Sequence, residues 1–189
     1  MGKLIYLMNV SLDGFVETVD HGLEWTRIDE ELHSWFNDQE RRMDAVLYGR
    51  RLYEVMAAYW PTAASDRNAT EIELDYARIW NAEPKIVFSR TLDSVTSNSR
   101  LVAGDVGEEL AKLKAEFSGD LGVGGPTLAA QFIQRGLVDE YGLVVHPVVI
   151  GAGTPYWPPL DQPIDLELME SRTFASGVIY HRYRSLRTS

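Results

Sequence analysis

The residues best placed for ligand chemistry are Gly124 and Gly125, which lie where an apolar segment passes into a helical pattern beginning at Pro126. Glycines let a ligand approach the backbone, and the first turn of a helix offers unpaired N–H groups at the positive end of its dipole. Such a helix start binds phosphate or pyrophosphate. Glycine at a strand-to-helix turn also allows tight packing, so this motif alone leaves both interpretations open.

Three arginines also follow apolar segments. Arg50 and Arg51 come directly after Gly49, and Arg90 comes after Ser89. Arginine binds phosphate through paired hydrogen bonds, although a single arginine beside a helix start is often only solvated. Three arginines together with a glycine turn favour an anionic ligand.

Two further residues follow the first apolar segment. Asp13 precedes Gly14. Its carboxylate could bind a substrate amine, or donate a proton if its pKa were raised, but an Asp-Gly pair is equally typical of a plain turn. Trp25 lies in the loop that follows, where it is either a rim residue or a cover for a flat heterocycle. Both alternatives stay open for each residue.

Other chemistries find little support. The four histidines are scattered without the spacing of zinc ligands, so we expect no metal site. The chain has no Gly-x-Ser-x-Gly elbow and no phosphate-binding loop of the Gly-x-x-x-x-Gly-Lys type. The glycines at 122, 124 and 125 do not match the spacing of the Rossmann fingerprint.

Composition narrows the class of protein. The chain has 189 residues, of which 45% are hydrophobic and 24% charged, and we expect one globular domain over residues 1–189. A net charge of −10 argues against a nucleic-acid partner. The chain has no cysteine, and no segment approaches the roughly 20 apolar residues that span a bilayer. We therefore expect a cytoplasmic protein that binds a small molecule and no membrane.

The pattern of apolar residues predicts the elements that position these groups. Strands alternate with helices, which predicts a three-layer α/β fold with a largely parallel sheet, and a last hairpin adds an antiparallel edge. Ligands of such sheets bind at the carboxyl ends of the strands. The predicted strands cover 3–10, 44–48, 84–90, 121–123, 140–145, 164–171 and 178–184, and the predicted helices cover 29–43, 52–59, 70–81, 105–117 and 126–135.

Six motifs in order resemble the dihydrofolate-reductase-like superfamily, and most closely its RibD C-terminal, or riboflavin reductase, branch. The resemblance covers nearly the whole chain. It implies the fold of that superfamily, a mostly parallel mixed sheet with a C-terminal antiparallel hairpin. The motifs are Ser11-Leu12-Asp13-Gly14-Phe15, Gly49-Arg50-Arg51-Leu52-Tyr53-Glu54, the segment 85–92, Gly124-Gly125, Leu137-Val138-Asp139-Glu140, and 147–151 with Gly153.

The resemblance implies an NADPH-dependent reductase that transfers hydride to a small pterin- or pyrimidine-like heterocycle or to a carbonyl. For such a reaction Asp13 is our candidate proton source, and we expect Asp13, Trp25 and Tyr53 to lie at the substrate. The residues implied in cofactor binding are Asn9, Val16, Gly49, Arg50, Arg51, Leu52, Ser89, Arg90, Val123, Gly124, Gly125, Pro126, Thr127 and Leu128.

The chain also departs from the pattern. Leu52 stands where many dihydrofolate reductases have a phosphate-binding threonine, and Leu32, Trp35 and Phe36 occupy the inward face where those enzymes place a pterin-binding acid. The alternative is a non-catalytic nucleotide-binding or regulatory protein that retains the fold. Related reductases pair through their late strands, and the apolar segments 141–150, 164–171 and 178–184 favour a homodimer.

Overall fold

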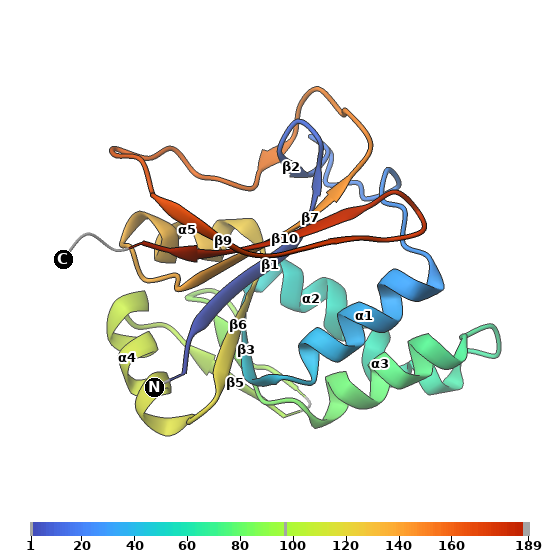
Figure 1. Cartoon of the computed structure of the whole chain (residues 1–189). Coiled ribbons are helices and arrows are strands. Elements are labelled where there is room, and N and C mark those ends of the chain that lie inside the picture. The colour runs from blue at the N-terminus through green and yellow to red at the C-terminus, as the bar shows by residue number, and fades with distance from the viewer. Residues whose placement is uncertain (1, 97, 187–189) are drawn as a thin grey trace.

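The structure, a computed structural model, describes residues 2–96 and 98–186, and it contains an eight-stranded sheet between two layers of helices (Figure 1). The sheet order is β5-β4-β3-β6-β1-β7-β10-β9. The strands are β1 (Leu4–Ser11), β3 (Met43–Gly49), β4 (Lys85–Phe88), β5 (Ser99–Val102), β6 (Asp120–Gly124), β7 (Glu140–His146), β9 (Leu166–Thr173) and β10 (Ile179–Ser185).

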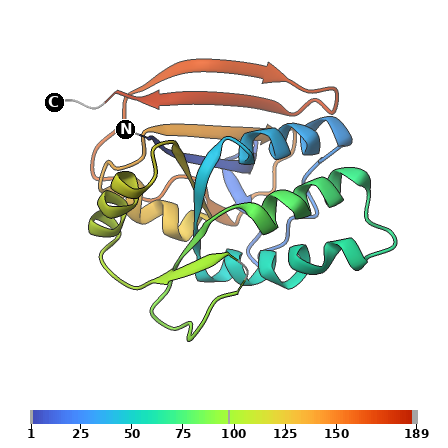
Figure 2. The ribbon, with the colours of Figure 1, turned by 90° about the horizontal axis from the view of Figure 1, so that it is seen from below.

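The first six strands in this order run parallel, and β10 and β9 close the sheet with antiparallel pairing. Figure 2 shows this hairpin along one edge of the molecule. A second sheet pairs β2 (Phe15–Glu17) with β8 (Thr154–Pro155). The helices are α1 (Glu30–Glu40), α2 (Arg50–Tyr59), the 3-10 helix η1 (Trp60–Ser65), α3 (Glu71–Ala82), α4 (Val106–Glu116) and α5 (Pro126–Gln134).

Alternation along β3 explains the layers. Ala45 and Leu47 face the core formed with α4 and α5, whereas Val46 and Tyr48 face the core formed with α2 and α3. Successive side chains of a strand point to opposite faces, so a central strand with two buried faces reads as continuously apolar. A third cluster packs α1 against β7 and β10. The predicted αβα fold with an antiparallel hairpin is confirmed.

Some element boundaries differ from the prediction. The helix predicted to reach Met43 ends at Glu40, because Met43 already pairs with Asp120 in the sheet. Part of the connection between the helices predicted at 52–59 and 70–81 is the 3-10 helix η1. The sequence did not predict β5 or the β2–β8 pair, which are short and owe their pairing to distant partners. No described helix has the length and apolarity needed to cross a membrane.

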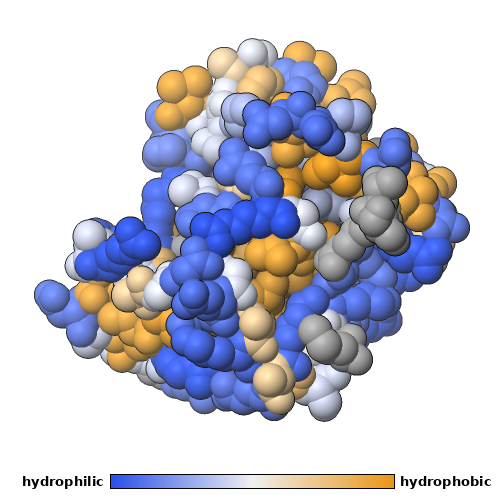
Figure 3. Space-filling view, turned by 90° about the vertical axis from the view of Figure 1, so that its left-hand side faces the viewer, coloured by the Kyte–Doolittle hydropathy of each residue, from blue (hydrophilic) through white to orange (hydrophobic). Residues whose placement is uncertain are grey.

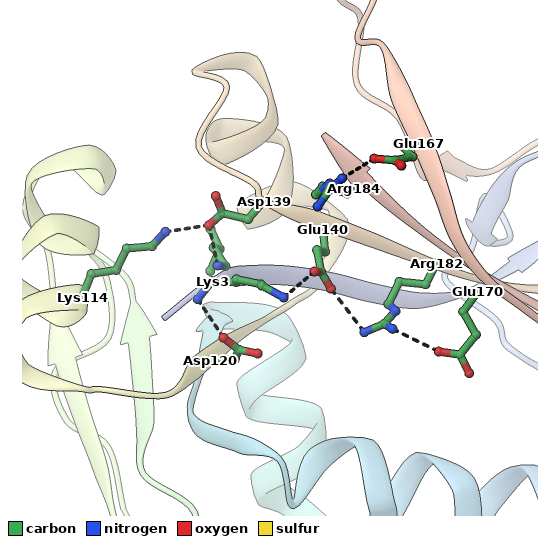
Figure 4. A network of polar contacts seen from close by, with 10 residues as sticks. Lys3, Lys114, Asp120, Asp139, Glu140, Glu167, Glu170, Arg182 and Arg184 are labelled. Atoms are coloured by element: carbon green, nitrogen blue, oxygen red, sulfur yellow. Dashed lines mark hydrogen bonds and ion pairs between the residues drawn. The ribbon is translucent and has the colours of Figure 1, made fainter. Parts of the chain in front are cut away.

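Charges gather at the amino-terminal ends of the parallel strands, where they pair with one another (Figure 4). The buried Glu140 accepts a hydrogen bond from Lys3 Nζ at 2.7 Å and lies 3.6 Å from Arg182, whose other partner is Glu170. Nearby, Lys114 Nζ donates to Asp139. Because these groups satisfy one another at the edge opposite the strands' carboxyl ends, we read them as structural.

The surface over α4 and α5 is mostly hydrophilic, with separate hydrophobic patches (Figure 3). This agrees with the formal charge of −10. A polar face of this kind keeps a protein from associating indiscriminately. The ligand chemistry therefore has to be sought in the cavities.

Candidate functional site

A cavity of about 520 Å³ lies where the strands' carboxyl ends meet the starts of α2 and α5. Pockets of this size suit small molecules and cofactors. One wall comes from β1, β2 and the loop after β2, and the other comes from α2, β4 and α5. Its lining residues are Met8, Val16, Glu17, His21, Leu23, Gly49, Arg50, Arg51, Leu52, Val55, Phe88, Ser89, Gly125, Pro126, Thr127, Leu128 and Gln131.

Both helices that start at this cavity have glycine at the N-cap, namely Gly49 before α2 and Gly125 before α5. We call this pair the glycine N-caps. Within the described part of the chain, neither helix start receives a side-chain cap. The other three α-helices among the described residues are capped by Asp29, Thr70 and Asp105. The two described α-helices without a side-chain cap therefore both begin at the cavity, where their N–H groups and dipoles favour an anion.

Of the two glycine N-caps, only Gly125 has a backbone conformation that requires glycine. Gly125 has φ of 92°, a conformation that side chains rarely adopt. Gly49 has φ of −75°, and a Cβ there would meet Leu128 Cβ at an ordinary 3.4 Å. Gly49 is therefore not required by the backbone, whereas Gly125 is. A small residue at position 49 keeps the helix start open.

The arginines surround the cavity without meeting in one cluster. Arg50 is exposed and donates to Glu54 and to Thr91 Oγ1, at 3.1 and 2.8 Å. Arg51 crosses to β2 and donates to Glu17. Arg90 lines an adjoining cavity of about 320 Å³ and makes no ion pair with the described residues. The two cavities share Phe88, Ser89 and Gln131, so together they could hold an elongated ligand.

Glu17 is the centre of a polar cluster in the cavity wall. It is 8% exposed and accepts hydrogen bonds from Arg51 (2.5 and 2.6 Å), Thr154 (2.7 Å) and His21 Nδ1 (2.9 Å). Burial opposes the ionisation of Glu17, but these partners outweigh it and lower its pKa. An ionised Glu17 thus joins β2 to α2 and β8.

Asp13 lies on a surface loop instead of lining the described cavities. Its carboxylate accepts hydrogen bonds from the backbone N–H groups of Ile150 and Gly151, at 3.2 and 2.8 Å. A hydrogen bond from Ser11, together with these two, lowers the pKa of Asp13. A proton donor would need the opposite shift. The catalytic role of Asp13 therefore stays a prediction that this geometry does not support: the carboxylate ties two loops together.

Asn9 and Trp25 surround the fully buried His146. The Nδ1 atom of His146 accepts from the Arg27 backbone N–H at 2.9 Å, so its Nε2 carries the hydrogen and donates to Asn9 Oδ1 at 2.8 Å. Burial, reinforced by the charge of Arg27, lowers the pKa of His146 to about 4. Trp25 packs edge-on against this ring. Neither Asn9 nor Trp25 lines the cavity; both fix the loop beside it.

Three other residues of the predicted site also lie outside the cavity lining. Tyr53 is 5% exposed, packs on Trp80 and donates its hydroxyl to Thr96 O, so it lies in the core, and its role at the substrate stays a prediction. Val123 belongs to β6 and faces the buried core. Gly124 leaves room for Tyr48 and Leu52, which a Cβ would approach to 3.1 and 3.0 Å.

The structure brings the other predicted residues to the two cavities. Those in the larger cavity are Val16, Gly49, Arg50, Arg51, Leu52, Ser89, Gly125, Pro126, Thr127 and Leu128, while Arg90 lines the adjoining one beside Ser89. Sequence reasoning missed Glu17 and His21. The only signal in the sequence was that these two residues are four positions apart after a short apolar segment. That spacing does not show that Arg51 and Thr154 bind the carboxylate of Glu17.

Comparisons with known proteins agree with this geometry. Residues 2–180 match the model of the RibD C-terminal domain. An uncharacterized protein of Bacillus subtilis (strain 168), YyaP, is 34% identical over 183 residues, which cover 95% of this chain and 94% of YyaP.

Two solved structures share the fold. A Shewanella sp. PV-4 protein named "Putative riboflavin biosynthesis protein" has a TM-score of 0.75 and 20% identity, with 98% of this chain and 99% of that one covered. A Thermotoga maritima diaminohydroxyphosphoribosylaminopyrimidine deaminase/5-amino-6-(5-phosphoribosylamino)uracil reductase has a TM-score of 0.65 and 13% identity, with 97% of this chain and 56% of that one covered.

Proposed function

Because the chain belongs to the RibD C-terminal domain family, we propose that it is an NADPH-dependent reductase that transfers hydride to a small heterocycle or carbonyl compound. The observation that carries the proposal is the pair of glycine N-caps, Gly49 and Gly125, at one cavity. Two helix dipoles directed at the same space favour a ligand with more than one negative charge. A pyrophosphate has that property.

The donors around the cavity fit a dinucleotide. The backbone N–H groups of the two helix starts would bind the pyrophosphate, with Arg50 beside them. The adjoining cavity, with Ser89 and Arg90, would take the phosphate that distinguishes NADPH from NADH. Bound NADPH would supply a hydride. The chain itself would hold the ligand, orient it, and provide the apolar surface of Met8, Val16 and Leu23.

The substrate class is the least specified part of the proposal. The Thermotoga maritima relative is named a uracil-type reductase, and a pyrimidine or related heterocycle is the first candidate for this chain. The cavity wall offers one carboxylate, Glu17, and Arg51 already pairs with it. A ring that needs its own carboxylate partner, as a pterin does, is therefore disfavoured.

The substitution Gly49→Asp tests the proposal directly. An aspartate at the N-cap would accept the N–H groups that the ligand needs and would place a negative charge beside its phosphates, while stabilising α2. We expect NADPH affinity, measured by calorimetry, to fall at least 10-fold with no loss of melting temperature. Gly49→Asn is the matched control, because it caps the helix without the charge and should lose less affinity.

Inorganic pyrophosphate serves as a second probe in the same titrations and should show the same ranking. Equal NADPH affinity in the wild type and Gly49→Asp would place the pocket elsewhere. NADPH binding without oxidation across a panel of pyrimidines, flavin precursors and ketones would instead favour the non-catalytic nucleotide-binding protein.

A further inference from the structure

His21 is a polar residue of the cavity to which the proposed function gives no part in holding the dinucleotide. His21 lies in the loop after β2 and lines the same cavity as the glycine N-caps. Its side chain is 55% exposed, so the ring can exchange protons with solvent. Its Nδ1 atom lies 2.9 Å from Glu17 Oε1. A hydride acceptor bound in this cavity would lie against a histidine that is held in place by a carboxylate.

Glu17 determines which nitrogen of His21 exchanges its proton. An ionised carboxylate only accepts hydrogen bonds, so the Nδ1 atom of His21 donates to it and keeps its hydrogen in both charge states of the ring. The Nε2 atom makes no hydrogen bond with the described residues. It is therefore the atom that gains and loses a proton.

The backbone holds His21 in an uncommon conformation. Its φ is 67°, in the left-handed region that is uncommon for residues other than glycine and in which asparagine, aspartate and histidine are the most frequent exceptions. Thr18 maintains the turn: its carbonyl accepts from His21 N–H at 3.0 Å, and its hydroxyl oxygen accepts from Gly22 N–H at 2.8 Å. Strain of this kind is found where a side chain must point in one direction. Here that direction is toward Glu17 and the cavity.

We propose that His21 is the proton donor of the reduction and that Glu17 is its positioning residue. The proposal rests on the proposed function, in which NADPH supplies the hydride. As the carbon of a C=O or C=N group takes up the hydride, its π bond breaks and the oxygen or nitrogen takes the proton from Nε2 of the imidazolium. NADPH is thereby oxidised to NADP⁺, the substrate is reduced by two electrons, and solvent reprotonates His21.

Charges around the ring favour this role. Two carboxylates belong to the surroundings of the ring: Glu17 from β2 contacts it, and Asp20 precedes it in the loop. Arg51, which reaches over from α2, is paired with Glu17 directly. A general acid must carry its proton, so turnover should fall once the pH is high enough to remove the proton from the ring.

Two variants separate chemistry from folding. His21→Asn keeps a residue that tolerates positive φ, and His21→Gly relieves the strain altogether. Turnover should fall by about 10²–10⁴-fold in both, the usual scale of general acid catalysis, and the decline with pH should disappear. Added imidazole should restore part of the activity of His21→Gly. His33→Gln, on α1 and outside the cavity, is the matched control and should behave as wild type.

The assay uses NADPH with two acceptors, 5-amino-6-(5-phosphoribosylamino)uracil and 9,10-phenanthrenequinone. A second readout needs no turnover. The chain has four histidines, so the ring Cε1–H signal that is missing from the His21→Asn spectrum belongs to His21. This signal should move when NADP⁺ is added, and the His33 signal should not.

The outcomes distinguish the two proposals. If the wild type binds no NADPH and no NADP⁺, the proposed function fails and the role of His21 fails with it. If NADP⁺ binds but the His21 signal does not move, or if His21→Asn keeps wild-type turnover and pH dependence, only the role of His21 is overturned. Full loss without imidazole rescue, together with a lower melting temperature, would show that His21 is structural.

Discussion

The guanidinium of Arg51 donates to both oxygens of Glu17, at 2.5 and 2.6 Å, and so joins helix α2 to strand β2 across the cavity wall. Glu17 is 8% exposed. Loss of Arg51 would leave a nearly buried carboxylate with fewer donors. For Arg51→Ala we expect a loss of about 1–3 kcal/mol in the free energy of unfolding at pH 7, measured by urea titration.

The pH dependence of that loss has a definite sign. The pKa of Glu17 is lowered in the folded protein, so its contribution is present above the unfolded pKa and disappears as the pH falls through the folded one. The loss in the free energy of unfolding caused by Arg51→Ala should therefore become smaller as the pH falls toward 3. Arg50→Ala, which removes an exposed pair with Glu54, is the control and should stay within about 0.5 kcal/mol of wild type. An equal effect of both changes would contradict the prediction.

Arg90 should select the cofactor. It lines the adjoining cavity without an ion-pair partner among the described residues, so its charge is available to a phosphate. We expect the wild type to bind NADPH at least 10-fold more tightly than NADH, and Arg90→Ala to lose most of that difference while its NADH affinity changes little. Calorimetry with both cofactors measures this. Equal affinities in the wild type would refute the selection.

Asp13→Asn distinguishes a structural loop from a proton source. The two N–H groups of Ile150 and Gly151 would lose a charged acceptor, so we expect a lower melting temperature. Turnover of any substrate found should remain within about 3-fold of wild type, far from the 10²-fold loss expected for a general acid. A selective loss of turnover at an unchanged melting temperature would restore Asp13 as a catalytic candidate.

Two carboxyl groups, Glu40 and Glu83, meet where the helices α1 and α3 end. Burial raises the pKa of Glu83 to about 9, and the proximity of Glu40 adds to the shift, while Lys85 opposes it. A raised folded pKa means that stability is lost as the pH rises from near 4.5 toward 9. Glutamine mimics the protonated acid, so Glu83→Gln should melt about 3–6 °C above wild type at pH 8.

At pH 5 the melting temperature of Glu83→Gln should be close to that of wild type, because Glu83 already holds its proton there. The exposed Glu24 provides the control, because Glu24→Gln should change the melting temperature equally at both pH values. Parallel melting curves of wild type and Glu83→Gln across pH 5–8 would show that the carboxyl pair is ionised in the folded protein.

Strand β9 is expected to mediate pairing of two copies. It forms one edge of the sheet (Figure 2), and its Leu168 and Met169 are 54% and 43% exposed. An edge with open backbone groups and apolar side chains favours association. Light scattering should give twice the chain mass of 21.3 kDa, and Leu168→Lys should reduce it. A wild-type mass of 21.3 kDa would count against the homodimer.

Local patterns predicted much of the fold. The caps Asp29, Thr70 and Asp105 mark three helix starts, and Pro126 begins α5 as expected. Gly136, just after α5, has φ of 64°, as a helix stop requires. These signals are local because each depends on neighbours within one helical turn. The alternation of strands and helices predicted the parallel sheet, and the last hairpin predicted its antiparallel edge, whereas the order of the strands came only from the structure.

The site was only partly predictable because its polar groups meet over long distances in sequence. Glycines and arginines at strand ends could be placed at one edge of the sheet, and they line the two cavities. Glu17, by contrast, could not be placed in the site from its sequence neighbours, because its partners Arg51 and Thr154 lie 34 and 137 residues away. The partners of Asp13 were hidden for the same reason, because Ile150 and Gly151 belong to a distant loop.

The glycine N-caps have a consequence for the lifetime of the protein. Each bare helix start forgoes a stabilising cap, so the free chain holds α2 and α5 less firmly than its ligand-bound form does. A ligand that completes both ends adds its binding free energy to the stability of the folded state. We expect NADPH to slow the digestion of the wild type by thermolysin more than it slows the digestion of Gly49→Asp. In a cell, the abundance of this protein would then follow the supply of its cofactor.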